Sequence, residues 1–502
     1  MTDRKLTSKP AAARRERRAP PPPKFVTGSL LRHLLIMTGT GSLGLVAIFI
    51  GDLANIFFLS LLDERKELVA AVGYGSTVLM LTIGIGIGLA IAATSLVSPA
   101  VGAGQNVRAR RLTANALIWT FAVSAVLAVL VWALIPQFLD LLGATGRTRE
   151  LAQSYLTIAV PALPPLALGM TASAVLRSVG DARRSMNVTL SGAVANVILD
   201  PILIFGLDMG IEGAAWASVI ARLTVMVVGF YGVIVVHKMM GRPKLRTCLA
   251  DGWPLAAVAI PAVATNLATP AANAYITAVI SQHGDAAVAG WTIIGRILPV
   301  AFGTVFALSG VVGPIIGQNY GARDKARMHE TLRLALYVTA GFTLFAWLVL
   351  ALAAPFIVEQ FQATGETADL IMLFCRWLSP LFFFLGALFV ANAVFNTLGR
   401  PHISTALNWA RATLGTVPFV MLGEAYWGAQ GVIVGQMLGG IVFGIFAVYL
   451  GHRLIDYLGD AERPQVVATR RLDRLINKFL GVAADDGVRN FNATTSSAKP
   501  NT

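Results

Sequence analysis

Charged side chains are scarce in this sequence. Only 13% of its 502 residues are Asp, Glu, Lys or Arg, about half the share in a soluble globular chain. Hydrophobic residues make up 56%, and the mean hydropathy is +0.68. Apolar runs of about 20 residues, the length of a helix that crosses a bilayer, recur along most of the chain. The sequence therefore predicts a protein embedded in the lipid bilayer.

Several chemical signatures are also missing. The two cysteines, Cys248 and Cys375, have neither metal-ligand nor redox spacing. There is no Walker loop, so ATP is not expected to drive this chain directly. The six histidines lie near loops or near the ends of apolar runs and form no catalytic cluster. These absences argue against a membrane-embedded enzyme, and we expect no cofactor beyond a coupling ion.

The apolar runs predict an all-α integral membrane protein with twelve transmembrane helices. They are rich in Gly and Ala and lack the alternation of a β-barrel. The expected spans are 30–61, 69–98, 112–139, 151–176, 184–206, 211–237, 253–281, 286–317, 330–357, 367–398, 402–423 and 429–455.

The basic residues indicate the orientation. A net charge of +14 lies in the two tails and in alternate loops rather than on one patch, so no nucleic-acid partner is expected. Lys and Arg in short loops mark the cytoplasmic side. We expect a bacterial inner-membrane protein, multi-pass and monomeric, with both termini in the cytoplasm.

The sequence repeats itself at a shift of about 218 residues. Ala144-Thr145-Gly146 recurs as Ala363-Thr364-Gly365, and Pro161 recurs as Pro380. Six spans per repeat make the repeats parallel, related by an axis along the membrane normal, as in transporters that rock one half against the other. The expected parts are a disordered Pro-rich tail (1–28), two six-helix bundles (29–240 and 253–457), a cytoplasmic linker (241–252) and a second tail (458–502) with an amphipathic helix near 465–481.

Ionisable residues at membrane depth are the candidates for coupling. Asp200 follows Asn196 by four positions, so the two side chains share a helix face, and Pro201 removes a backbone donor and predicts a kink. These oxygens suit Na⁺ or a proton relay. Asp52 and Asn55, one turn apart in the first span, are further candidates. Burial disfavours the charged form of a carboxylate, which suits reversible protonation.

The second half has arginines where the first has acids. Arg296, Arg376 and Arg411 are expected to extend toward the headgroups. In the alternative they face a cavity and favour an anionic or zwitterionic ligand. The residues of this expected substrate cavity are Asn266, Asn273, Arg296, Arg376, Asn392 and Arg411.

Several motifs resemble the multidrug and toxic compound extrusion (MATE) family of the prokaryotic type. They are the stretches Ala174–Arg183, Asn196–Gly206, Gly213–Arg222, Gly317–Ala322 and Asn396–Gly399. The resemblance covers residues 30–455. It implies two six-helix bundles around a central cleft, and antiport of organic compounds against H⁺ or Na⁺ by alternating access.

The resemblance also implies an ion site in the N-terminal bundle. Asn196 and Asp200 match the family's fifth-helix pair, and Ser218 matches a sixth-helix hydroxyl that is more often Thr. The family's first-helix Asp position is taken by Asn55 when the chain is aligned on Ala70-Ala71-Val72-Gly73, and by Asp52 if the frame is shifted. Both alternatives stay open, as does the choice between H⁺ and Na⁺.

The leading hypothesis is therefore a secondary antiporter that exports a small organic molecule such as a drug, toxin or metabolite. A lipid-linked precursor flippase of the same superfamily is the alternative, although such proteins commonly have more than twelve spans.

Overall fold

The computed structural model describes residues 23–459, apart from residue 60 and residues 63–64. This described part of the chain is helical and contains no strand. Eleven of its helical segments are long and apolar enough to cross a membrane. The amphipathic helix expected near 465–481 and residues 1–22 of the expected first tail lie outside the described residues.

The first half consists of the helices up to residue 236. Two of its long segments are interrupted at a proline, one at Val160–Ala162, which contains Pro161, and one directly after Pro201, because proline removes a backbone donor from the helix. Its elements are α2 (Leu30–Leu59), α3 (Arg65–Gly102), α4 (Asn106–Ala133), α5 (Ile135–Leu141), α6 (Gly146–Ala159), η1 (Val160–Ala162), α7 (Leu163–Ser178), α8 (Ala182–Pro201), the π-helical η2 (Ile202–Gly206), α9 (Gly210–Phe230) and the π-helical η3 (Tyr231–Val236).

The second half repeats this order. A break at Ser379–Leu381 corresponds to the one at Val160–Ala162 in the first half. Its elements are α10 (Leu245–Ile280), η4 (Ser281–His283), α11 (Asp285–Gly321), α12 (Lys325–Gln360), α13 (Gly365–Leu373), the π-helical η5 (Phe374–Leu378), η6 (Ser379–Leu381), α14 (Phe382–Thr397), α15 (Pro401–Thr413) and α16 (Val417–Gly459).

The last apolar segment, Pro401–Leu458, contains two spans. The backbone leaves helical geometry at Trp427 and Gly428, where Gly428 has a φ of 56°. On either side the chain packs against itself in pairs placed symmetrically about Trp427: Gly423 with Gly431, Phe419 with Gly435, and Gly415 with Gly439. A Cβ on Gly423, Gly431, Gly435 or Gly439 would overlap the backbone of the opposing segment, so two antiparallel helices meet here. The prediction of twelve spans is confirmed.

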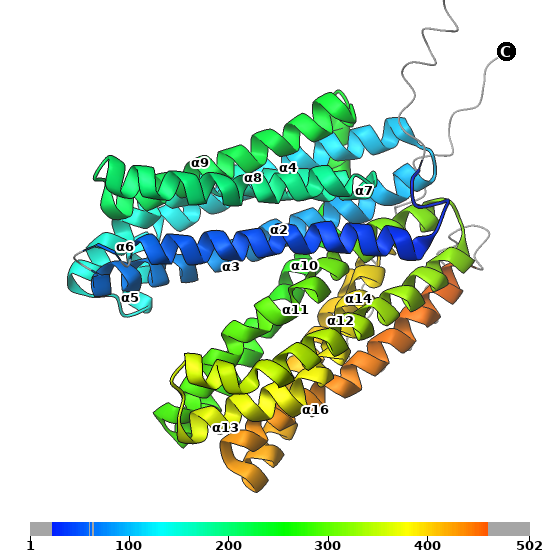
Figure 1. Cartoon of the computed structure of the whole chain (residues 1–502). Coiled ribbons are helices and arrows are strands. Elements are labelled where there is room, and N and C mark those ends of the chain that lie inside the picture. Colours follow the sequence, from blue (N-terminus) through cyan, green and yellow to red (C-terminus); the bar gives the residue numbers. More distant parts are fainter. Residues whose placement is uncertain (1–22, 60, 63–64, 460–502) are drawn as a thin grey trace, which may run out of the picture.

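The two halves form separate groups of helices that diverge toward one end of the molecule (Figure 1). The first and last described residues lie together at the opposite end, which we call the tail side. The other end, where α13 and the α5–α6 connection lie, we call the far side.

At the tail side the halves meet backbone to backbone, through α3 and α11. A Cβ on Gly321 would overlap the carbonyl oxygen of Pro99, and one on Gly102 would overlap that of Gln318. Gly317 lies equally close to Ser98. We call these contacts the glycine joint, and only the smallest residue permits this approach.

Residues 24–28 also contact both halves, which corrects the expected disorder of that part of the first tail. Phe25 is 1% exposed. Its backbone N–H donates to Gln318 Oε1 (2.9 Å), and its carbonyl accepts from Arg327 Nη2 (2.9 Å) in the second half. The Lys24 ammonium donates to the carbonyl of Gly180 in the first half (3.0 Å). This short segment bridges the halves beside the glycine joint.

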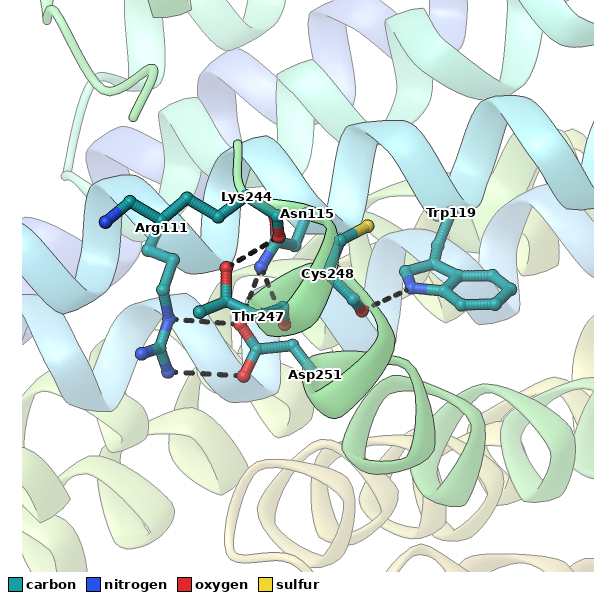
Figure 2. A network of polar contacts seen from close by, with 7 residues as sticks. All are labelled: Arg111, Asn115, Trp119, Lys244, Thr247, Cys248 and Asp251. Atoms are coloured by element: carbon teal, nitrogen blue, oxygen red, sulfur yellow. Dashed lines mark hydrogen bonds and ion pairs between the residues drawn. The ribbon is translucent and has the colours of Figure 1, made fainter. Parts of the chain in front are cut away.

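The expected linker between the halves is partly helical, because α10 begins at Leu245. Asp251 forms an ion pair with Arg111 (3.1 Å) and accepts a hydrogen bond from Asn115 Nδ2 (2.7 Å), both on α4. These contacts satisfy the one acidic residue of the predicted linker. Figure 2 shows the whole network, formed by Arg111, Asn115, Trp119, Lys244, Thr247, Cys248 and Asp251.

We expect Asp251→Ala to destabilise the protein by about 1–3 kcal/mol, since it leaves the buried Asn115 amide with only the Thr247 carbonyl as acceptor and removes the ion-pair partner of Arg111. The matched control is Asp140→Ala, whose ion pair with Arg149 is largely exposed and contributes less than about 1 kcal/mol. Thermal unfolding of the purified variants in detergent compares them. Equal unfolding temperatures for the two variants would contradict this role of Asp251.

Candidate functional site

Asp200 is a fully buried carboxylate near the end of α8. Asn55 on α2, itself 7% exposed, donates from Nδ2 to both carboxylate oxygens at 3.1 Å. The two helices approach closely because Gly44 lies against Thr189 and Gly51 against Ala193. The structure therefore brings together two residues that are 145 positions apart in the chain.

No Lys, Arg or His within the described residues forms an ion pair with Asp200. The carboxylate has a neutral amide as its hydrogen-bond donor, and burial without a counter-charge disfavours its ionised form. One turn earlier on the same helix, Asn196 has a buried Oδ1 with no hydrogen-bond donor. An unsatisfied oxygen one turn from a buried carboxylate suits a proton or a small cation that prefers oxygen ligands.

The sequence also assigns Ser218, Asp52 and Pro201 to this site. Ser218 is 9% exposed on α9, which packs along α8, but no hydrogen bond within the described structure joins its hydroxyl to Asp200. The side chain of Asp52 lies outside the described residues. Pro201 ends α8, and the π-helical turn η2 begins directly after it, as expected from a kink at that position.

In the second half, Arg411 does not extend to the surface as expected. It is 5% exposed on α15, and its guanidinium donates from Nη2 to the Thr269 hydroxyl on α10 (3.1 Å). Asn392 on α14 accepts a hydrogen bond from Asn408 Nδ2 (3.1 Å), which lies one turn before Arg411. Two of the expected cavity residues thus lie at neighbouring positions around α15.

The other expected cavity residues are more dispersed. Asn266 and Asn273 lie on α10, Asn266 with a buried and unpartnered Nδ2 and Asn273 exposed. Arg296 is exposed on α11. Arg376 is exposed on η5, where its carbonyl accepts from Trp347 of α12. Arg376 therefore belongs to a different face from the α10–α15 contact.

Sequence reasoning missed Thr269 and Asn408. Asn408 precedes Arg411 by three positions, and Thr269 follows Asn266 by three, so each shares a helix face with a predicted cavity residue. That spacing of polar residues inside apolar runs was the available signal.

A family model described as MatE matches residues 42–202 and 261–422, more than half of the chain. The two matched stretches fall in the two halves. The chain belongs to the MatE family of transporters. The family assignment suggested by the motifs is thereby confirmed, and with it the expectation of a membrane transporter rather than an enzyme.

Among the relatives of this MatE protein is the FAD transporter of Shewanella oneidensis, 29% identical over 85% of this chain and 95% of that protein. The multidrug export protein MepA of Staphylococcus haemolyticus is 21% identical over 80% of this chain and 89% of its own length.

Solved structures agree with the fold. A point mutant of the Vibrio cholerae MATE transporter VcmN has a TM-score of 0.78 at 26% identity and covers 84% of this chain and 96% of that one. A MOP superfamily transporter from Pyrococcus furiosus has a TM-score of 0.80 at 22% identity and covers 87% of this chain and 98% of that one.

Proposed function

We propose that this MatE protein is a secondary antiporter that exports an organic compound in exchange for H⁺ or Na⁺ and takes its coupling cation at Asp200. The observation that carries the proposal is the buried carboxylate of Asp200, bound to Asn55 and without a counter-ion among the described residues. Because no cationic side chain among the described residues pairs with this carboxylate, a cation that enters would be attracted to it without displacing a protein group.

The tail side is the cytoplasmic side in this proposal, because its loops carry the basic residues. The halves are joined there and diverge at the far side (Figure 1), the arrangement of a transporter open to the outside. Binding the cation in the first half would then bias the halves toward the other arrangement, as alternating access requires. We further propose a bacterial inner-membrane location and a monomer.

Flavin nucleotides are the first solutes to try, because the relative with 29% identity is named an FAD transporter. The test is transport of FAD by purified protein in liposomes, with a pH gradient and a Na⁺ gradient imposed separately. Net movement against the FAD concentration under at least one gradient supports antiport. If both gradients leave the FAD distribution unchanged and drugs of the kind exported by multidrug transporters give the same result, the antiport proposal fails.

Asn55→Leu is expected to slow gradient-driven transport by about tenfold at limiting ion concentration, since it removes the donor that holds the Asp200 carboxylate. Thr40→Val on the same helix is the control, because that hydroxyl bonds only to carbonyls of its own helix. Initial transport rates at several ion concentrations measure the effect. An unchanged ion dependence in Asn55→Leu would remove Asn55 from the site and favour Asp52 as the partner of Asp200.

A further inference from the structure

Arg411 is a cation buried in the middle of the second half. It lies ten residues after the start of α15, about 15 Å along the helix and so near half the thickness of a bilayer core. Its side chain is turned inward, toward Thr269 on α10, and 5% of the residue is exposed. It therefore does not reach the headgroups, and its position needs another explanation.

The hydrogen bonding of this guanidinium is incomplete. Nη2 donates to the Thr269 hydroxyl, but Nε is buried and has no acceptor. No ion pair joins Arg411 to a carboxylate within the described residues, and the sequences of α10 after Asp251, of α11 after Asp285 and of α15 contain no acid. A buried charge that faces only a neutral partner is costly, so an anion would stabilise it.

A second unsatisfied donor lies on the same side of α10. Asn266 precedes Thr269 by three residues and Asn273 follows it by four, so the three form one polar stripe along the helix. The Nδ2 of Asn266 is buried without a partner. Arg411 and Asn266 thus offer two N–H donors that lack acceptors. The oxygens of a phosphate or carboxylate would accept hydrogen bonds from both.

This stripe borders the surface that faces the first half. Val263 on α10 contacts Gly88 of α3, and positions 267, 270 and 274, which continue that helix face toward the far side, are exposed. Asn266 and Asn273 lie about 60–80° around the helix from this face. A solute that contacts this exposed face of α10 would therefore reach the stripe around one side of the helix.

Arg296 borders the same region. Ala307 of α11 lies against Gly41 of α2, and Arg296, eleven residues earlier, points within about 20° of the same direction. Arg296 is exposed. The surface of the second half that faces the first therefore carries an exposed cation, in addition to the cation buried between α10 and α15.

The internal repeat relates this site to the cation site, because the two lie on corresponding pairs of helices. Ala54-Asn55 and Ala272-Asn273 are 218 residues apart, and α2 and α8 correspond to α10 and α15. The first pair of helices holds the Asn55–Asp200 contact, and the second holds the Thr269–Arg411 contact. Corresponding helix pairs therefore present a carboxylate in one half and a guanidinium in the other.

We propose that Arg411, Thr269 and Asn266 bind the phosphate or carboxylate group of an organic anion. This inference rests on the proposed transport function and specifies its substrate class. In this arrangement the coupling cation and the anionic group of the substrate bind in different halves.

The test is equilibrium binding to purified wild-type protein in detergent, without any ion gradient. FAD, FMN and riboflavin are the probes, since they share the flavin ring and differ in their phosphates. We expect FAD and FMN to bind more tightly than riboflavin. Arg411→Gln should weaken FAD binding by about ten- to a hundredfold and leave riboflavin binding unchanged, and Arg411→Lys should recover part of the loss.

Asn266→Leu keeps the guanidinium, and we expect it to weaken FAD binding by about three- to tenfold. It tests the site even if Arg411→Gln does not fold. Equal wild-type affinity for FAD and riboflavin, no binding of any of the three, or an equal loss for FAD and riboflavin in the variants would overturn the anion site. Transport of an uncharged or cationic solute that still depends on Asp200 would then leave the proposed antiport standing.

Discussion

Asp200→Asn is expected to reduce gradient-driven transport to the level of protein-free liposomes. The substitution keeps the size of the side chain and its capacity to accept from Asn55, but it removes the only group of the pair that can carry a negative charge. A neutral amide neither binds a proton reversibly nor balances a cation. Binding of FAD without a gradient should persist, because Arg411 lies in the other half.

Asp208→Asn provides the matched control for this variant. Asp208 lies in the loop after η2, is exposed and has a φ of 51°, a backbone conformation that Asn adopts as readily as Asp. Transport by Asp208→Asn should equal that of the wild type. If Asp200→Asn transports as well as this control under both gradients, the carboxylate has no part in coupling.

Gly321→Val should abolish transport by preventing closure of the tail side. The glycine joint holds α3 and α11 with no room for a Cβ at Gly321, Gly317 or Gly102. Valine at position 321 would push α11 away from Pro99 and separate the halves where they now meet. The arrangement of Figure 1 would then be lost in favour of one that is open at the tail side.

The distance between spin labels on the two halves at the far side measures this change. Glu150→Cys and Glu359→Cys, both exposed, provide the labels in a variant whose Cys248 and Cys375 are replaced by Ala. We expect a shorter far-side distance in Gly321→Val. Gly310→Val is the control, because a Cβ at Gly310 of the same helix meets no atom within 4 Å. Wild-type distances together with wild-type transport in Gly321→Val would show that the joint does not need glycine.

The sequence predicted the spans because each apolar run must satisfy its own backbone hydrogen bonds in lipid, and helices do so. The sequence was less informative about segments whose conformation depends on tertiary contacts. The basic and Pro-rich start of the chain reads as disordered, yet the contacts of Phe25 with Gln318 and Arg327 fix it. Likewise, α10 starts eight residues before the expected span, because residues of α4 satisfy Asp251.

The candidate site, too, was predictable where helical spacing determines it and not where helix packing does. Helical spacing placed Asn196 and Asp200 on one face, but it left the choice between Asp52 and Asn55 open, since that choice depends on the position of α2 against α8. The structure places the amide of Asn55 on Asp200. The inward orientation of Arg411 depends on the contact between α10 and α15, and an arginine inside an apolar run does not reveal its direction.

The central claim is that the cation passes through the first half at Asp200. The most direct test measures the flux of the ion itself, with a pH-sensitive dye or with labelled Na⁺, while liposomes containing the protein take up FAD. The wild type should move one of the two ions opposite to FAD, and Asp200→Asn should move neither. An ion flux in Asp200→Asn that equals the wild-type flux and still runs opposite to FAD would contradict the account.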